Sequence, residues 1–308
     1  MRAFIFPGQG SQSVGMGAAL AGASRAARDV FDEVDEALGQ NLFLLMREGP
    51  DEELKLTENA QPAIMAHSIA VLRTMGVQLA DAARFVAGHS LGEYSALCAA
   101  GSFDLATTAK LLKLRGQAMQ QAVPVGEGAM AALLGADLAL AQKIAEAAAQ
   151  GEVCTVANDN DPSQVVISGQ KSAIDRAIAM AKEMGAKRAV PLPVSAPFHC
   201  PLMQPAAEAM RDALSYVIVS PPCVPLYANV TAQPETDPDT IRNQLVEQVT
   251  GMVRWRESVA NMFDAGVGEF VEIGGKVLGA MVKRTAADAR VTSVVTIEDV
   301  EATAKEIA

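Results

Sequence analysis

A serine between two glycines is the strongest candidate for chemistry in this sequence. Residues 88–92, Gly-His-Ser-Leu-Gly, have the Gly-x-Ser-x-Gly pattern of a nucleophile elbow, a sharp turn that exposes a serine hydroxyl. The apolar residues 85–87 before it predict a buried strand, and residues 94–100 after it predict a helix. A strand, a tight turn and a helix in this order indicate nucleophilic catalysis by Ser90.

The same residues also fit a structural role for Ser90. If Ser90 is a nucleophile, the N–H of Leu91 lies at a helix N-terminus, where it can stabilise a developing oxyanion. If Ser90 is only a turn residue, its side chain caps the helix, because Ser90-x-x-Glu93 fits a capping box. The remaining sequence has to decide between the two.

A serine nucleophile needs a general base, and the chain has three histidines from which to choose. His89 occupies the elbow itself, so its side chain should point away from the Ser90 hydroxyl. His67 lies within a predicted helix, where a packing role is expected. His199 lies in a proline-bounded loop far along the chain, as expected of a base that approaches from another loop. Elimination therefore favours His199, although no orienting carboxylate can be identified.

Arg115 lies on the apolar side of a predicted amphipathic helix over 104–121. It is three residues from Leu112 and four from both Leu111 and Met119, so it shares their face. An arginine there costs free energy unless it is paired. Either the side chain reaches solvent or makes an internal ion pair, or Arg115 binds an anionic ligand.

The first predicted strand, residues 3–6, runs into Pro7-Gly8-Gln9-Gly10-Ser11-Gln12. A strand followed by glycines suggests a phosphate loop, but Ser13 stands where the third glycine of Gly-x-Gly-x-x-Gly would be. A dinucleotide cofactor is therefore not expected. The segment is either a tight strand-to-helix turn or a loop whose N–H groups line an anion site.

Composition excludes several classes of function. The net charge of −11 argues against binding nucleic acid or an anionic membrane surface. The four cysteines show neither paired nor metal-ligand spacing, which is typical of a reducing cytoplasm. We expect no metal, no secretory leader and no membrane span.

The predicted elements fall into two groups. Residues 127–193 predict the order β-α-β-β-α-β of a ferredoxin-like unit, with 158–162 as the turn between its middle strands. The flanking residues 1–126 and 194–308 predict a larger α/β unit with buried strands. We therefore expect an α/β protein with a small inserted domain.

Several of these segments together resemble malonyl-CoA:acyl carrier protein transacylases of type II fatty-acid synthesis, over essentially the whole chain. The elbow 88–94, the arginine helix 115–120 and the histidine loop 193–200 each resemble a motif of that family. Residues 6–12, 61–63 and 158–169 resemble further motifs. One departure is Gly274-Gly275-Lys276, where many relatives have Gly-Pro-Gly-Lys, and it puts only the local turn in doubt.

The resemblance implies a function and a set of roles. It implies an α/β-hydrolase-like core, transfer of malonyl from malonyl-CoA to the phosphopantetheine thiol of acyl carrier protein, and no cofactor. Ser90 would be acylated and His199 would be the base. The resemblance further implies that the carbonyl of Gln248 orients His199. The backbone N–H groups of Gln9 and Leu91 would form the oxyanion hole. Arg115 would bind the malonyl carboxylate.

Three other functions compete with this interpretation. A serine hydrolase or thioesterase would share Ser90 and His199 but would use water as acceptor and leave Arg115 without a clear task. A polyketide-type acyltransferase would serve another carrier. A non-catalytic carrier-binding protein would not need the elbow, the base and the arginine.

Overall fold

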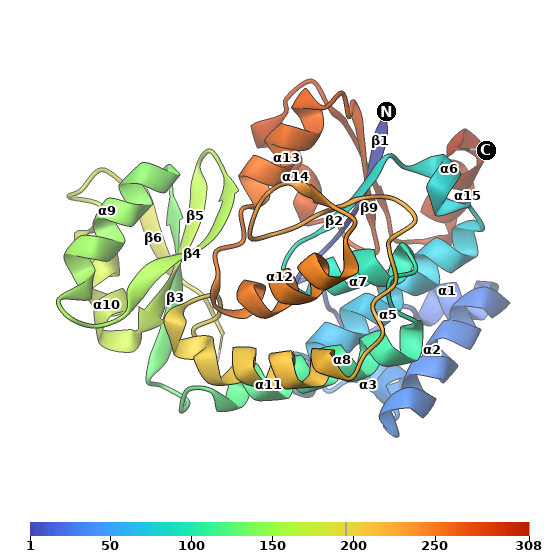
Figure 1. Ribbon diagram of the computed structural model, residues 1–308, viewed down its shortest axis with the longest axis horizontal. Coiled ribbons are helices and arrows are strands. Elements are labelled where there is room, and N and C mark those ends of the chain that lie inside the picture. The colour runs from blue at the N-terminus through green and yellow to red at the C-terminus, as the bar shows by residue number, and fades with distance from the viewer. Residues whose placement is uncertain (195, 308) are drawn as a thin grey trace.

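In the computed structural model, which describes residues 1–194 and 196–307, the chain forms a mixed α/β structure with two sheets (Figure 1). Ser195 in the predicted histidine loop and Ala308 lie outside the described residues. The larger sheet is six-stranded, with the order β10-β9-β1-β2-β7-β8. The smaller sheet is four-stranded, with the order β4-β5-β3-β6.

The larger sheet is parallel except at one edge, where β8 pairs antiparallel with β7. Its central strand is β1, which lies between β2 and β9. The strands are β1 (Arg2–Phe6), β2 (Phe85–Gly88), β7 (Leu226–Tyr227), β8 (Pro234–Glu235), β9 (Glu269–Ile273) and β10 (Arg290–Val294). A mostly parallel sheet must be covered on both faces, which the helices provide.

Alternate residues of β1 enter different cores. Phe4 and Phe6 belong to the cluster that contains residues of α2, α5, α7 and α8. Ala3 and Ile5 belong to the cluster that contains residues of α13 and α14. Because successive side chains of a strand point to opposite faces, the strand is buried on both sides.

The helices around this sheet begin and end as follows. The N-terminal half contributes α1 (Ala18–Ala23), α2 (Arg25–Leu38), α3 (Leu42–Glu48), α4 (Asp51–Leu54), α5 (Thr57–Met75), α6 (Leu79–Ala82), α7 (Leu91–Ala99) and α8 (Leu105–Gln121). The C-terminal half contributes the 3₁₀ turn Pro201–Met203 and α11 (Gln204–Ser215), α12 (Pro238–Thr250), α13 (Trp255–Asp264), α14 (Leu278–Thr285) and α15 (Ile297–Ile307). None of the helices in the described ranges has the length and hydrophobicity that a membrane crossing requires.

Helix α5 contains a proline. The helix starts at Thr57 without a side-chain cap, and Pro62 lies inside it. Pro62 cannot donate the hydrogen bond of a helix interior. Burial of nearly the whole helix between α2 and α8 outweighs this local preference.

His67 on α5 makes stability dependent on pH. The side chain is 4% exposed, its Nδ1 has no hydrogen-bond partner among the described residues, and burial lowers its pKa to about 4. The unfolded chain, with a pKa of about 6.5, therefore binds the proton more tightly than the folded protein. The stability held by neutral His67 is present above pH 6.5 and is lost as the pH falls toward 4.

We expect this one group to remove about 2 kcal/mol of unfolding free energy between pH 7 and pH 5. Urea unfolding at both pH values should show a smaller difference in His67→Gln than in wild type. Equal pH differences in the two proteins would contradict the role of His67.

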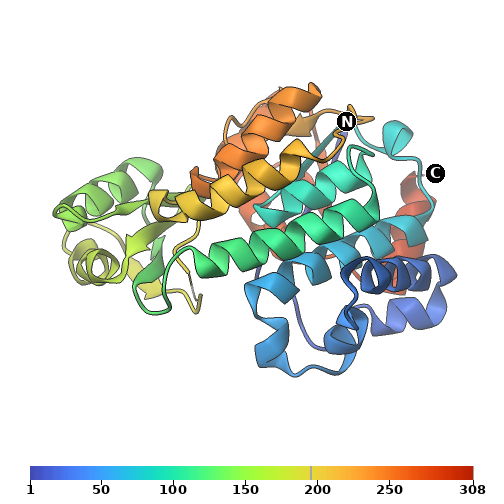
Figure 2. The same cartoon turned by 60° about the horizontal axis from the view of Figure 1, so that its bottom comes forward.

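The smaller sheet has the element order predicted from sequence. It is β3 (Gly128–Leu134), α9 (Leu138–Ala149), β4 (Cys154–Asp161), β5 (Gln164–Gln170), α10 (Lys171–Ala181) and β6 (Arg188–Pro191). All its pairings are antiparallel, and a separate apolar cluster fills the space between the sheet and its helices. This sheet and its helices lie at one end of the molecule (Figures 1 and 2). The predicted fold class, an α/β-hydrolase-like core with a ferredoxin-like insert, is confirmed.

The turn predicted at residues 158–162 is shorter and begins later, since only Pro162 of those five residues belongs to it. Residues 158–161 are the end of β4, and the turn follows at Pro162 and Ser163. Register irregularities interrupt the β4–β5 pairing, and Asn158 forms a parallel bridge with Val253 of the larger unit. The polar composition that suggests a turn therefore serves a contact between the two units.

Two ion pairs join the end of β4 to the larger unit. Asp159 is 1% exposed and pairs with Arg256 of α13 at 2.8 Å. Asp161 is fully buried and pairs with Arg284 of α14 at 2.6 Å. Each buried carboxylate depends on its arginine, since removing one partner of a buried pair leaves an uncompensated charge. These pairs hold β4 against the core.

Candidate active site

Ser90 lies at the turn between β2 and α7, with φ 54° and ψ −110°. The turn requires glycine on either side, because a Cβ on Gly88 would lie 1.9 Å from the Gly92 carbonyl and one on Gly92 would lie 2.3 Å from the Phe6 carbonyl oxygen. Ser90 makes no side-chain capping bond to α7. Its hydroxyl is therefore free for other partners, and the capping-box interpretation is wrong.

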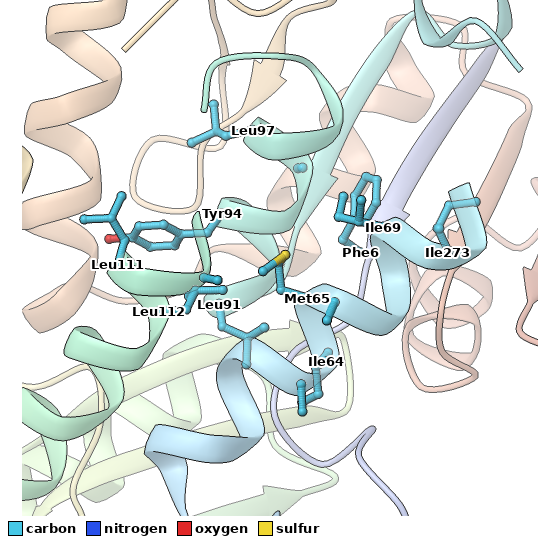
Figure 3. Packing of buried hydrophobic residues seen from close by; sticks show 14 of the residues in the cluster. Phe6, Ile64, Met65, Ile69, Leu91, Tyr94, Leu97, Leu111, Leu112 and Ile273 are labelled. Atoms are coloured by element: carbon cyan, nitrogen blue, oxygen red, sulfur yellow. The ribbon is translucent and has the colours of Figure 1, made fainter. Parts of the chain in front are cut away.

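The helix after the turn is fixed by apolar packing. Tyr94 and Leu97 of α7, Leu111 and Leu112 of α8 and Met65 of α5 belong to one buried cluster (Figure 3). Burial of such side chains contributes about 1.5–3 kcal/mol each. This packing holds the start of α7, and with it Ser90 and Leu91, in one position.

The structure brings Ser90, His199 and Gln248 into one chain of hydrogen bonds. The Ser90 Oγ lies 2.7 Å from His199 Nε2, and His199 Nδ1 lies 2.8 Å from the Gln248 carbonyl oxygen. A carbonyl only accepts, so Nδ1 carries the proton and Nε2 is left to accept from the Ser90 hydroxyl. This is the geometry of a serine nucleophile with a base that a backbone carbonyl orients.

His199 is held neutral by its surroundings. Burial and, to a lesser extent, the positive charge of Arg115 lower its pKa to about 3, although the hydrogen bond to Gln248 opposes both effects. A neutral imidazole can take the Ser90 proton, whereas an imidazolium cannot.

The side chains of the other two histidines lie away from the Ser90 hydroxyl, as expected from their positions in the sequence. His89 Nε2 lies 2.8 Å from Asn160 Oδ1, and its ring packs against Trp255 with centroids 5.7 Å apart. His67 is buried within α5. Of the three, only His199 is within hydrogen-bonding distance of Ser90 in the part of the chain that is described.

Arg115 is buried beside the serine and neither reaches solvent nor forms an ion pair within the described residues. It is 1% exposed, and its guanidinium donates to Gln61 Oε1 at 2.8 Å, Ser90 Oγ at 3.1 Å and Gln248 Oε1 at 2.9 Å. Burial lowers its pKa, while Tyr94 and Glu93 raise it. The neutral partners leave its positive charge largely uncompensated, as a site for an anionic ligand requires.

A cavity of 460 Å³ opens beside Ser90, and the two remaining residues of the predicted site, Gln9 and Leu91, line it. Gln9 follows β1 and Leu91 begins α7, and both line the cavity together with Arg115 and His199. Because Leu91 is the first residue of a helix, its N–H has no carbonyl partner within the helix. The smaller unit contributes Met130, Asn158, Leu192 and Pro193 to the lining of the same cavity.

Sequence reasoning missed two groups that hold the elbow. Asn229 Oδ1 accepts from the Ser90 N–H at 2.8 Å, and its Nδ2 donates to the Gly88 carbonyl at 2.7 Å. Glu93, considered only as a capping residue, instead accepts from the Asn229 N–H and from Gln248 Nε2. A polar residue shortly after a buried strand was the available signal for Asn229, since such residues gather at the carboxyl edge of a parallel sheet.

Comparison with known proteins gives consistent results. The acyl transferase domain family matches residues 3–303. The malonyl CoA-acyl carrier protein transacylase of Escherichia coli (strain K12) is 47% identical over 283 residues, 92% of each chain. The crystal structure of an acyl-carrier-protein-S-malonyltransferase from Bartonella henselae has a TM-score of 0.97 and 52% identity, and covers 99% of both chains.

Another similar structure is a complex with an acyl-carrier protein. It is a type II PKS acyl-carrier protein in complex with its malonyl-transacylase, with a TM-score of 0.96, 40% identity and coverage of 99% of both chains. In each of these comparisons the similarity extends over nearly the full length of this chain and of the chain with which it is compared. The chain belongs to the acyl transferase family and, within it, to the malonyl CoA-acyl carrier protein transacylases.

Proposed function

We propose that this protein transfers a malonyl group from malonyl-CoA to the phosphopantetheine thiol of an acyl carrier protein, in fatty-acid biosynthesis. The observation that carries the proposal is the presence of Ser90, His199 and a buried, uncompensated Arg115 in one cavity. The names of the relatives and the carrier protein bound to one of them support the same donor and acceptor.

The first half of the reaction forms a malonyl ester on Ser90. His199 Nε2 takes the hydroxyl proton while Oγ attacks the thioester carbonyl. The carbonyl oxygen becomes an oxyanion between the backbone N–H groups of Gln9 and Leu91, each worth roughly a hundredfold in rate. The C–S bond then breaks, and coenzyme A leaves as a thiol with the proton that His199 had taken.

The second half reverses these steps with a different thiol. The phosphopantetheine thiol of the carrier gives its proton to His199 and attacks the ester carbonyl, through the same oxyanion site. The C–O bond to Ser90 breaks, and Oγ recovers a proton from the imidazolium. His199 and Ser90 end in their starting states, so no cofactor is consumed.

Arg115 selects the acyl group. A malonyl group ends in a carboxylate, with which a guanidinium can form a bidentate pair, whereas acetyl has no such group. An uncharged acyl group leaves the buried arginine unpaired, at a cost of roughly 2–5 kcal/mol. By the usual conversion this is about a 30- to several-thousandfold preference.

Arg115→Ala should therefore lose most malonyl transfer and narrow the gap between malonyl-CoA and acetyl-CoA. Arg115→Lys should recover only part, because lysine lacks the paired donors. The measurement is kcat/KM for both donors, with circular dichroism to verify folding. Lys113→Ala, which removes a cation two residues away on α8, serves as a matched control. A folded Arg115→Ala protein with the wild-type preference would refute the role.

A transfer assay tests the proposed function against its rivals. Purified protein, malonyl-CoA and holo carrier should yield malonyl-carrier faster than free malonate. Predominant hydrolysis would favour a thioesterase, and equal use of methylmalonyl-CoA would favour a polyketide-type acyltransferase. Failure of malonyl-CoA to modify the protein at all would favour a non-catalytic carrier-binding protein.

We also propose that residues 1–126 and 194–308 form the catalytic domain and residues 127–193 an inserted domain. The separate sheets and the separate apolar cluster of the smaller unit support this division. Limited proteolysis should cut first near residues 126 and 194, and early cuts elsewhere would count against it. A cytoplasmic location follows from the proposed substrates, and cell fractionation tests it.

A further inference from the structure

Glu93 is a buried carboxyl group that the proposed reaction does not use. It lies in the first turn of α7, three residues after Ser90, and is 1% exposed. One oxygen accepts from the backbone N–H of Asn229 at 3.3 Å. The other accepts from the side-chain amide of Gln248. Burying a carboxyl group costs free energy of folding, so a buried carboxyl group this close to the nucleophile is expected to have a specific role.

The side chain of Gln248 lies between Glu93 and Arg115. Its Nε2 donates to Glu93 and to the Ser90 carbonyl at 3.0 Å, while its Oε1 accepts from Arg115 Nη2 at 2.9 Å. An amide has one donating end and one accepting end, which differ little in shape. Glu93 favours the observed direction, because reversal would point the amide oxygen of Gln248 at the carboxyl oxygen that now accepts from it. The guanidinium favours the same direction, because it only donates.

Both protonation states of Glu93 can perform this task. Burial raises its pKa to about 8, while the hydrogen bond from Gln248, the bond from Asn229 and the charge of Arg115 lower it. A carboxyl group keeps acceptor capacity after protonation. Glu93 can therefore accept from Gln248 on either side of that pKa.

We propose that Glu93 is a positioning residue for acyl selection: it orients the Gln248 amide, which holds Arg115 so that the guanidinium faces the carboxylate of the acyl group. The proposal rests on the proposed function in that the acyl group carries a carboxylate. Gln248 then contributes twice, since its backbone carbonyl orients His199 and its side chain orients Arg115.

Glu93→Gln tests the proposal with little change in shape. The new amide has one accepting oxygen, so it can accept from the Asn229 N–H or from Nε2 of Gln248 but not from both. When its NH₂ group faces Nε2 of Gln248, the two donors cannot bond, and Gln248 turns or withdraws from Arg115. The malonyl-to-acetyl ratio of kcat/KM should fall about tenfold or more, the loss expected for one hydrogen bond to a charged group. The KM for malonyl-CoA should rise.

Glu272→Gln is the matched control. Glu272 is a fully buried carboxyl on β9 whose oxygens accept from the N–H groups of residues 277–279 at the start of α14. Its substitution should lower the unfolding midpoint in urea and leave the malonyl-to-acetyl ratio unchanged. If Glu93→Gln likewise lowered the unfolding midpoint and left the malonyl-to-acetyl ratio unchanged, its role would be structural alone, and the proposal would be overturned.

A double-mutant cycle tests whether Glu93 acts through Gln248. Gln248→Met removes the amide but keeps the backbone carbonyl that His199 uses. If Glu93 acts through the amide, adding Glu93→Gln to Gln248→Met should not reduce the ratio further. Losses that add in the double variant would contradict the proposal.

An NMR measurement separates failure of this proposal from failure of the proposed function. The side-chain amide signal of Gln248 can be assigned by its disappearance in Gln248→Met. It should shift in Glu93→Gln and remain in place in Glu272→Gln. A wild-type protein without malonyl preference would refute the proposed function, whereas an unmoved amide signal in Glu93→Gln would refute the positioning role.

Discussion

Replacing Ser90 by alanine should abolish the one-malonyl increase in intact mass that we expect for the wild-type protein after mixing with malonyl-CoA. Ser90 is the residue whose hydroxyl lies 2.7 Å from a neutral imidazole and opens into the cavity. Loss of the nucleophile in a serine-histidine pair lowers turnover on the order of 10⁴- to 10⁶-fold. The transfer rate to the carrier should fall by a similar factor.

Ser95→Ala is a suitable control for this experiment. Ser95 lies on α7, the helix that follows Ser90, is fully buried, and its hydroxyl has no partner among the described residues. This variant should acquire the malonyl unit as the wild type does. A malonyl adduct that persists on the Ser90→Ala protein would place the nucleophile elsewhere.

Replacing His199 by alanine should lower transfer by at least about a thousandfold while the protein stays folded. Without the imidazole, no described group within hydrogen-bonding distance of Ser90 Oγ can accept its proton, since Arg115 only donates. Steady-state transfer assays and circular dichroism measure the two outcomes. His67→Gln, which alters a histidine outside the cavity, should keep its activity. Near-normal turnover in His199→Ala would assign the base to another residue.

The pH profile gives a second test of His199. Burial and Arg115 lower the pKa of His199 to about 3, so the imidazole stays neutral well below the ordinary histidine value of about 6.5. The base becomes protonated, and activity is lost, only as the pH falls toward that lower value. In the range where the protein stays folded, kcat/KM, which reports the titration of the free enzyme, should not fall by half near pH 6.5. A half-point there would indicate an exposed base.

Much of the site could be predicted from sequence because it depends on local patterns. The elbow needs glycines at fixed spacing, and the amphipathic period of α8 shows that Arg115 faces the interior. The smaller unit could be predicted because its strands and helices alternate with clear periods.

The remaining part depends on contacts between distant segments. Asn229 reaches the elbow from the loop after β7 and the Gln248 side chain from α12, and no local pattern reveals the direction of either side chain. The end of β4 has the composition of a turn but continues as a strand, because Arg256 and Arg284 from other helices neutralise its buried aspartates. Partners separated by about a hundred residues or more are invisible to periodicity.

The backbone of Ser90 links the evolution of this protein to its catalysis. A non-glycine residue at φ 54° and ψ −110° costs on the order of 1–3 kcal/mol, a penalty that glycine would avoid. Stability alone would therefore favour glycine at this position, and selection for turnover opposes it. A descendant of this chain that lost its catalytic role would gain folding stability from a glycine at position 90. The serine thus marks a compromise that persists only while natural selection maintains activity.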